Sequence, residues 1–479
     1  MLRLYNTLTK QKQEFKPLNK GKVSIYTCGP TVYDYIHIGN LRSFVTADVL
    51  RRYLEYSGYE VRHIKNITDV GHLTADDIAQ ADTGEDKMLK AALRENKSPQ
   101  EIAKFYEKAF RHDEEKMNIL PAHYFPRATA HIPQMIKMIK TLIEKGHAYE
   151  KNGNVFFDVT SFKDYGKLSG NTLDKLKVGA RLEEHPDKKN PWDFALWLAS
   201  EPKHLLQWDS PWSRGYPGWH IECSAMATEY LGDTLDIHTG GEDNIFPHHE
   251  AEIAQSECFS GKKFVNFWVH TRHLLVEGEK MAKSKGNFYL PQDITKRGFD
   301  LMHLRLLYLS SHHRKNLDFS WKALGQAKAN YERIAEWLGK LKEITKHKTK
   351  SLTKAKMIVK ERLLPEFEEA MNDDLNIPLA LASLYEFITV LNLRISKKSL
   401  DYKEAQEILD TFEKMNEVFG LKFPEKEIEI PEEVKKLADE RLEARKNKDF
   451  QKADELRKEI EKMGYLIEDL EDGCKIKKL

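Results

Sequence analysis

The stretch KVSIYTCGPTVYDYIHIGNLRSFVTADVLRRYLEYSGYEVRHIKNI, residues 22–67, decides the fold. Its β-branched and aromatic start, Lys22–Thr27, predicts a buried strand. From about Leu41 to Tyr56 apolar residues recur at spacings of three to five, which predicts a helix. Glu60–Ile67 predicts a second strand. A strand, a helix and a strand in so short a span indicate a parallel sheet with a right-handed crossover.

The same pattern resumes later in the chain. Strands are predicted at Thr234–His238 and Asn266–His270, with a helix around Ile253 between them. The intervening region has short strands, such as the one at 154–159, and many turn residues, which indicates an insertion. From about Trp321 the pattern becomes helical to near Gly420, with a Thr/Lys-rich connection at 345–353.

The last fifty residues predict a small module. Two helical patterns begin at Pro431, and Gly464 ends the second as a C-cap. A hairpin follows, with its turn at Asp472-Gly473. We therefore expect an α/β protein: a Rossmann-like parallel-sheet domain at 1–119 and 213–320, an insertion at 120–212, an all-α bundle at 321–425 and an α+β module at 426–479.

Composition excludes several classes of protein. In 479 residues, 41% are hydrophobic and 32% charged, which is too apolar for general disorder. The formal charge of +1 gives no bulk attraction for nucleic acid, so an RNA partner would need local patches. Four cysteines are too few for a disulfide scaffold and indicate a reducing compartment, the cytoplasm. We find no targeting segment and expect no membrane-spanning stretch.

Two polar segments are typical of phosphate chemistry. In PTVYDYIHIGN, His37 and Asn40 flank a glycine where the first strand meets its helix, and a helix N-terminus offers N–H groups to phosphates. In KMAKSKGN, at 280–287, clustered lysines could neutralise charge on a leaving pyrophosphate. The alternatives are a helix-entry turn with a surface histidine and a solvated charge run.

A third segment, GGEDNIFPHHEAE at 240–252, is typical of a metal site. If Pro247 starts a helix, His248 and Glu252 lie four residues apart on one face. Thiolates from Cys28 and Cys223 would complete a zinc site. The alternatives are a core histidine, a hydrogen bond within one helix, and cysteines that act as small hydrophobic residues.

Together and in this order, the three segments resemble class I aminoacyl-tRNA synthetases, and specifically the cysteinyl-tRNA synthetase family. HIGN resembles the class motif HIGH and KMAKS the motif KMSKS. The segments TCGPTVYDYIHIGN, NITDVGH, PGWHIECSAM and GGEDNIFPHHEAEIAQS resemble the cysteine-specific motifs. MNDDLNIPLALASL resembles the family's anticodon-binding bundle. The resemblance covers nearly the whole chain.

The resemblance implies the following site. One zinc ion per chain has as ligands Cys28, Cys223, His248 and Glu252. The implied catalytic residues are His37, Asn40, Lys280 and Lys283. Three of them, His37, Asn40 and Lys283, contact ATP, which binds together with Mg²⁺. The cysteine pocket includes Gly29, Thr68, Trp219, His238 and Asp243. The sequence departs from the family motifs at two positions: Asn40 replaces a histidine and Ala282 replaces a serine. We expect the protein to remain active with these residues, and we expect them to affect the reaction rate.

The implied reaction joins cysteine to ATP as cysteinyl adenylate and then transfers it to the 3′ end of tRNA(Cys). A pocket contact separates near-isosteres such as serine and cysteine by only about 10- to 200-fold. Zinc coordination of the substrate thiolate can supply more, because an alcohol is a harder and less acidic ligand. Four protein ligands usually close a zinc site. We therefore expect the substrate sulfur to add a fifth ligand or to displace one, such as Glu252.

The remaining expectations concern partners. Residues 441–462 hold eight basic and six acidic side chains, a modest patch that suits contact with tRNA, although solvated helix faces are an equal alternative. We expect a monomer. Two other functions stay open: a ligase that passes cysteine to a small amine, and a zinc-stabilised RNA-binding paralogue without catalysis. Charging of total tRNA tests the first, and cysteine-dependent exchange of pyrophosphate into ATP tests the second.

Overall fold

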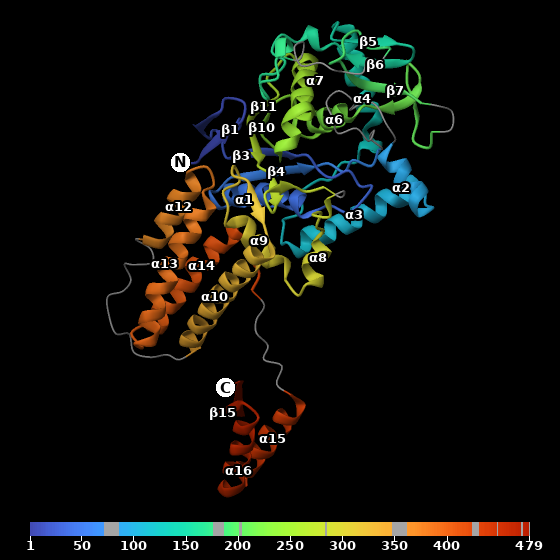
Figure 1. Ribbon diagram of the computed structural model, residues 1–479. Helices are drawn as coiled ribbons and strands as arrows, with labels where there is room; N and C mark the ends of the chain where they lie inside the picture. The colour runs from blue at the N-terminus through green and yellow to red at the C-terminus, as the bar shows by residue number, and fades with distance from the viewer. Residues whose placement is uncertain are drawn as a thin grey trace. The chain divides into compact units, whose positions relative to one another are not determined.

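The predicted strand–helix–strand unit lies at the centre of the computed structural model (Figure 1). Strand β3 (Lys22–Thr27) leads to helix α1 (Ile38–Tyr56), and strand β4 (Glu60–Lys65) pairs parallel with β3. Helix α1 begins three residues before the predicted start, because His37 caps it. The structure describes residues 1–70, 86–175, 186–200, 204–282, 285–346, 362–423, 431–447, 449–470 and 473–478.

The second half of the sheet also follows the prediction. Strands β10 (Leu235–Gly241) and β11 (Val265–Thr271) are joined by α7 (Glu250–Ser260), and the parallel sheet has the order β11-β10-β3-β4. The chain leaves β3 toward β4 and leaves β10 toward β11, in opposite directions. The carboxyl ends of β3 and β10 therefore form a topological switch point, where open α/β sheets bind ligands.

The insertion is a small antiparallel sheet with one long helix. Its strand order is β5-β6-β7-β9-β8. The predicted strand at 154–159 is β6, which ends at Phe157 because a 3₁₀ turn begins at Val159. The described elements here are α4 (Ile132–Glu144), β5 (Ala148–Lys151), β6 (Asn154–Phe157), β7 (Phe194–Ala199), β8 (Trp208–Asp209) and β9 (Arg214–Pro217). Helix α6 (Trp219–Leu231) then returns the chain to the parallel sheet.

Several shorter elements surround the parallel sheet. A hairpin of β1 (Arg3–Asn6) and β2 (Gln11–Glu14) was not predicted. The remaining elements of this region are α2 (Lys87–Glu95), α3 (Pro99–Lys116), β12 (Leu274–Val276), β13 (Glu279–Lys280), α8 (Pro291–Lys296), α9 (Leu301–Leu309) and β14 (Leu317–Phe319).

Two buried arginines join these elements to α1. Arg42 donates to the carbonyl groups of Arg272 and His273, both at 2.7 Å. Arg305 of α9 forms an ion pair of 2.6 Å with Asp48 of α1, and both side chains are fully buried. When these charged groups are buried, they lose their hydrogen bonds with water. Their partners in the protein replace those bonds.

The helical region after Trp321 is confirmed in the described residues. It contains α10 (Trp321–Lys346), α12 (Leu364–Asn372), α13 (Ile377–Ser396) and α14 (Tyr402–Phe419), which ends at Gly420 in the left-handed conformation. Most of the predicted connection at 345–353 lies outside the described residues. Contrary to our expectation, α13 is long and apolar enough to cross a membrane. A single such helix is weak evidence for a span, and its residues Leu384, Phe387 and Leu391 are buried in the fold.

The chain divides into two compact units, Met1–Leu421 and Lys422–Leu479. The second unit has the predicted two helices and hairpin: α15 (Glu432–Lys446), α16 (Phe450–Lys462), β15 (Tyr465–Leu470) and β16 (Gly473–Lys478). Its core includes Val434, Ile460 and Ile467. Asp472 of the predicted turn lies outside the described residues. The finer division into four domains stays a prediction.

Candidate active site

A cleft of about 480 Å³ opens at the carboxyl ends of β3 and β10. The loop between β3 and α1 forms one wall, and the turn after β10 together with β12 and β13 forms the other. Its lining includes Cys28, Gly29, Tyr35, His37, Asn40, Asp243, His273 and Lys280. The predicted phosphate-binding loop therefore opens into the same cleft as Cys28.

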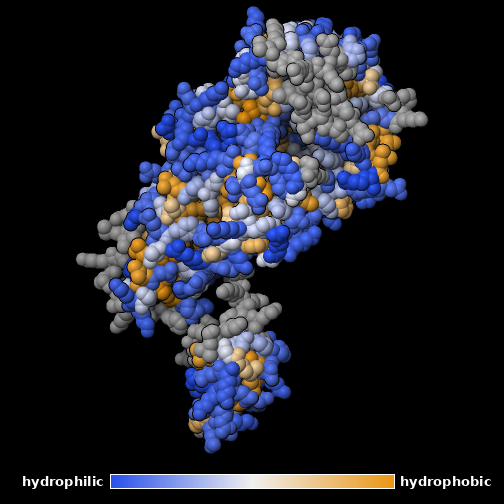
Figure 2. Space-filling view, in the orientation of Figure 1, coloured by the Kyte–Doolittle hydropathy of each residue, from blue (hydrophilic) through white to orange (hydrophobic). Residues whose placement is uncertain are grey.

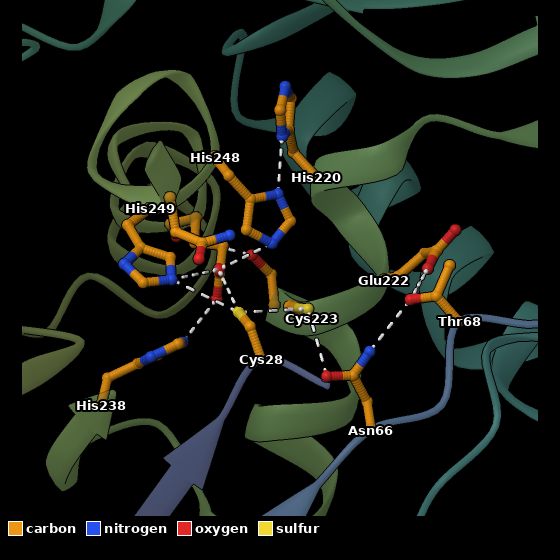
Figure 3. Close-up of polar contacts among 12 residues, drawn as sticks. Cys28, Asn66, Thr68, His220, Glu222, Cys223, His238, His248 and His249 are labelled. Atoms are coloured by element: carbon orange, nitrogen blue, oxygen red, sulfur yellow. Dashed lines mark hydrogen bonds and ion pairs between the residues drawn. The ribbon is translucent and has the colours of Figure 1, made fainter. Parts of the chain in front are cut away.

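The structure brings all four predicted zinc ligands together. Cys28 follows β3, Cys223 comes from α6, His248 precedes α7, and Glu252 lies in the first turn of α7 (Figure 3). One ligand atom from each lies within 4.8 Å of the others. Since Cys28 also lines the cleft, this four-residue metal group lies against the cleft wall.

The spacing of these atoms fits a zinc ion. Sγ of Cys28 lies 3.8 Å from Sγ of Cys223 and 3.6 Å from Oε1 of Glu252. Nε2 of His248 lies 3.1 Å from the same carboxylate oxygen. Zinc bonds of about 2.0 to 2.3 Å in a tetrahedron put ligand atoms roughly 3.3 to 3.8 Å apart. Two sulfurs, a nitrogen and an oxygen are also a typical zinc donor set.

The turn before α7 brings His248 and Glu252 together as predicted. Phe246 has an extended backbone, with φ −141° and ψ 133°, and the helical run begins at the next residue, Pro247, and continues into α7. His248 and Glu252 therefore lie side by side, four residues apart. The predicted pairing is confirmed, with Pro247 at the start of the helical run.

A second histidine from this turn, which the sequence did not single out, also reaches Cys28. Nε2 of His249 lies 3.3 Å from Sγ of Cys28, and Nε2 of His238 lies 3.0 Å from Oε2 of Glu252. Cys28, His238, His249 and Glu252 thus form an overlapping group that meets the same distance limit. Gly240 permits this approach, since a Cβ there would lie 2.6 Å from Cε1 of His249. The adjacent pair His248-His249 was the available sequence signal.

Two further histidines, His220 and His270, bond the rings of His248 and His249 on the side away from Cys28 and Glu252. His220 bonds His248 through their Nδ1 atoms at 2.9 Å, and Nε2 of His270 bonds Nδ1 of His249 at 2.7 Å. His270 in turn bonds the hydroxyl of Thr7 at 2.8 Å. Such outer hydrogen bonds fix the ring orientation of a metal-ligating histidine. These contacts join α6, β11 and the turn after β1, so local sequence patterns could not indicate them.

Burial sets the protonation of the site. It lowers the pKa of His248, and likewise that of His220 and of His270, to about 3, so these rings are neutral and able to ligate a metal. Burial, with the neighbouring Cys223, raises the pKa of Cys28 well above its usual value. The hydrogen bond with Cys28 lowers the pKa of Cys223, but burial and the charge of Glu252 reverse this and raise it. A cation would remove both protons, because only thiolates ligate metals.

Four of the five predicted cysteine-pocket residues lie around the metal group. The Gly29 N–H donates to Oδ1 of Asn66 at 2.8 Å, and Nδ2 of Asn66 donates to Thr68 Oγ1 at 3.0 Å. Trp219 stacks on His248 with ring centroids 4.5 Å apart. His238 contacts Glu252 as described above. Asn66, buried between the thiol of Cys223 and Thr68, was missed by the sequence analysis.

Asp243, the fifth pocket residue, lies on the other wall. Its Oδ1 accepts from Nζ of Lys280 at 2.7 Å and contacts Nε2 of His273 at 2.9 Å. Hydrogen bonds with Lys280 and His273 outweigh partial burial and lower the pKa of Asp243. Asp243 is therefore a carboxylate on the wall that carries Lys280.

His37 and Asn40 form a reciprocal cap at the start of α1. Nδ1 of His37 accepts from the N–H groups of Gly39 at 3.0 Å and of Asn40 at 3.3 Å, and Oδ1 of Asn40 accepts from the His37 N–H at 3.1 Å. An accepting Nδ1 leaves the ring proton of His37 on Nε2, a hydrogen-bond donor. The helix-entry interpretation is therefore correct, and it is compatible with phosphate binding at this helix end.

The lysine-rich segment is described only in part. Lys283, the predicted ATP-contacting lysine, and Ser284 lie outside the described residues. Asn287 holds the ends of the segment together: its Oδ1 accepts from the Ala282 N–H at 2.8 Å, and its Nδ2 donates to the carbonyl of Lys280 at 3.2 Å.

Comparison with protein families covers most of the chain. Residues 14–329 match the class I (C) tRNA synthetase catalytic domain, residues 366–424 the DALR domain, and residues 428–474 the cysteinyl-tRNA ligase anticodon binding domain.

Curated relatives and solved structures are also similar to the chain. The cysteine–tRNA ligase of Chlorobaculum tepidum is 43% identical to it, over 99% of this chain and 98% of the relative. The cysteine–tRNA ligase of Treponema denticola is also 43% identical, over the whole length of both chains. The cysteine–tRNA ligase of Thermus thermophilus is 42% identical over 98% of each chain. A methionyl-tRNA synthetase structure from Mycobacterium tuberculosis, bound by methionyl-adenylate, has a TM-score of 0.58 and 14% identity, covers 84% of this chain and 88% of its own, and supports the fold alone.

Proposed function

Because the chain belongs to the cysteinyl-tRNA synthetase family of class I aminoacyl-tRNA synthetases, we propose that its metal group selects cysteine through a zinc ion. Membership makes the chain a cysteine–tRNA ligase that uses ATP. In the first half-reaction a carboxylate oxygen of cysteine attacks the α-phosphorus of ATP and pyrophosphate leaves. In the second, a ribose hydroxyl at the 3′ end of tRNA(Cys) attacks the carbonyl carbon and AMP leaves.

The observation that carries the proposal is the convergence of Cys28, Cys223, His248 and Glu252 on one point at the cleft wall. Bound there, zinc would favour the thiolate of cysteine over the hydroxyl of serine. Zinc binds soft sulfur ligands well, and it lowers the pKa of a thiol that coordinates it. Two sulfurs favour this group over the overlapping one with His238 and His249, which offers a single sulfur. Those two histidines instead hold Cys28 and Glu252 from the other side.

The surrounding residues would position the amino acid. The side chain of Asn66 bonds both Thr68 and the N–H of Gly29, so both residues can line the path of the substrate side chain beside Cys28. Trp219 and His238 would wall this pocket through their contacts with His248 and Glu252. Asp243, a carboxylate on the opposite wall, suits the ammonium group of the amino acid.

The phosphates of ATP would lie at the start of α1. There the helix dipole and the Nε2–H of His37 favour negative charge, while Asn40 completes the cap. Lys280 and Lys283 would stabilise the charge that moves onto pyrophosphate as the P–O bond breaks. Mg²⁺ would accompany the ATP. In place of the family's histidine, Asn40 cannot carry a positive charge, so any help it gives is by hydrogen bonding alone.

Further proposals concern partners and place of action. The C-terminal unit and the helical bundle would bind tRNA(Cys), with α15 and α16 supplying the basic residues. We also propose that the enzyme works as a monomer in the cytoplasm, as an enzyme of protein synthesis does.

Metal removal tests the zinc proposal. We expect one zinc per chain by elemental analysis, lost in the Cys223→Ala variant and retained in the His249→Gln variant. Dialysis against a chelator should weaken equilibrium binding of cysteine at least tenfold, and zinc should restore it. Serine binding should be weak before and after, because its hydroxyl gains little from the metal.

Two results would contradict this assignment. If the metal-free enzyme still preferred cysteine to serine by the same factor, zinc would not be the basis of selection. If His249→Gln lost the metal and Cys223→Ala kept it, the overlapping group would be the site.

A further inference from the structure

Helices α2 and α3 present a basic surface with two exposed apolar side chains beside the cleft. Leu93 is 81% exposed and Phe105 is 45% exposed. Around them lie the exposed side chains of Lys90, Arg94, Lys97, Lys104 and Lys108. We call this surface the α2–α3 platform. In Figure 2 an apolar patch lies over the region of α2, bordered by hydrophilic residues.

The platform is positively charged on its exposed face. Glu95 pairs with Arg94 at 2.9 Å and with Lys97 at 3.1 Å, and the carboxylate of Glu101 accepts from the Ser98 N–H at 2.9 Å. The positive charge in excess therefore comes from Lys104 and Lys108. The ammonium group of Lys97 lies 4.7 Å from the ring centroid of Phe105, so a basic side chain of α2–α3 borders the aromatic ring directly.

The platform continues directly into the cleft wall. Tyr35, which lines the cleft, contacts the ring of Phe105 at 6.1 Å and that of Tyr106 at 5.0 Å. Arg94 lies 3.7 Å from the carboxylate of Asp34, another lining residue. A chain that leaves the cleft past Tyr35 therefore meets Phe105 first.

Caps and buried contacts hold the platform in place. Asp86 caps α2 through the N–H groups of Met88 and Leu89, and Ser98 with Glu101 forms a capping box at the start of α3. Met88, Ala92 and Tyr106 are buried between the platform and the rest of the fold. The exposed side chains thus stand on two fixed helices, which lowers the entropy lost when a ligand binds.

We infer that the α2–α3 platform binds the unpaired nucleotides at the 3′ end of the tRNA, with a base stacked on Phe105 and phosphates near Lys104 and Lys108. This inference rests on the proposed function, because the 3′-terminal ribose must reach the cleft and the nucleotides before it must lie just outside. Surfaces for single-stranded nucleic acid combine basic side chains with aromatic rings on which bases stack. A protein partner fits less well, since isolated apolar side chains among lysines make a poor hydrophobic interface.

Variants of the platform test the inference in the full-length enzyme. We expect Phe105→Ala to raise the KM for tRNA(Cys) about 5- to 100-fold, the range typical of a lost base stack, and Phe105→Trp to restore it. Lys104→Glu with Lys108→Glu should also raise this KM and should reduce its dependence on salt. Cysteine-dependent exchange of pyrophosphate into ATP, which needs no tRNA, should change less than twofold.

A control pair comes from the opposite end of the sheet. Leu18, 46% exposed, and Lys20 lie before the start of β3, away from the cleft. Leu18→Ala and Lys20→Glu should leave the KM for tRNA unchanged. Competition with tRNA that lacks its unpaired 3′ nucleotides completes the test: wild type should bind it more weakly than intact tRNA, and Phe105→Ala should reduce the difference in affinity between the two.

The outcomes separate this inference from the function itself. If Phe105→Ala charges tRNA as wild type does, or weakens intact and truncated tRNA by the same factor, the platform does not bind the 3′ end, and the ligase function stands. If the wild-type enzyme exchanges pyrophosphate but charges no tRNA, the proposed function fails and the inference fails with it.

Discussion

Gly29 shows how one residue determines the geometry of the site. A Cβ at this position would lie 1.7 Å from the backbone oxygen of Asn66, which no side-chain rotation can relieve. The absent side chain lets the loop after β3 lie directly against the loop after β4, so that the Gly29 N–H reaches the side chain of Asn66, which also contacts the thiol of Cys223.

We predict that Gly29→Ala lowers the free energy of unfolding by about 2 to 4 kcal/mol, because the backbone must move apart, and that it loses the metal. Thermal melting and metal content measure the two effects. Gly325→Ala is the control: nothing lies within 4 Å of a Cβ there, and alanine is the better helix former, so it should be neutral or slightly stabilising. Equal effects at both glycines would contradict the steric argument.

Helix α1 is the element in which local structure and chemistry coincide. His37 and Asn40 satisfy N–H groups at its first turn, and this cap also forms the cleft wall where phosphates would bind. The cap explains why the helix begins at Ile38, earlier than its apolar periodicity indicates. It also explains how asparagine can replace the family's histidine without loss of the helix start.

The two roles of Asn40 can be separated by substitution. Asn40→Asp keeps an oxygen that accepts from the His37 N–H, and its charge suits a helix N-terminus, so the melting temperature should stay within about 2 °C of wild type. The same charge should repel phosphates and raise the KM for ATP at least tenfold in pyrophosphate exchange. Asn40→Ala should instead lose about 1 kcal/mol of stability through the broken cap. An unchanged KM for ATP in Asn40→Asp would remove this residue from the nucleotide site.

At the scale of the whole molecule, several histidines are buried in the described part of the chain, inside and outside the metal group. His63 and His313 are buried in other parts of the larger unit, and desolvation, with nearby cations and histidines, lowers the pKa of each well below 6.5. In the unfolded chain these rings bind protons below about pH 6.5, and in the folded protein they do not. The unfolded state therefore takes up more protons as pH falls, and the free energy of unfolding decreases.

We predict that the free energy of unfolding falls between pH 7 and pH 5, by about 1.4 kcal/mol per pH unit for each such histidine once the pH is below 6.5, and that the melting temperature falls with it. Melting curves at fixed ionic strength measure this slope. His313→Gln should make the slope shallower by about one proton. A stability that rises as the pH falls over this range would show that these rings are charged in the folded protein.

The local sequence determined much of this protein. The strand–helix–strand order at residues 22–67, the bundle, the C-terminal hairpin and the pairing of His248 with Glu252 follow from periodicity, turn residues and caps, which act over a few residues. The resemblance of the motifs to one family supplied the four candidate ligands. The structure places these ligands together, and the family comparisons agree with the resemblance.

Only the tertiary structure decided the rest. The bonds between His220 and His248, between His270 and His249, and from the Gly29 N–H to Asn66 join residues that are 21 to 37 positions apart, and the ion pair of Arg305 with Asp48 spans 257 residues. The packing of whole strands and helices decides which of these groups become partners. A hydrogen bond forms only where the donor–acceptor distance is correct to within a few tenths of an ångström. The local sequence determines which segments form a helix or a strand. The contacts between segments form only when all of them pack into one fold.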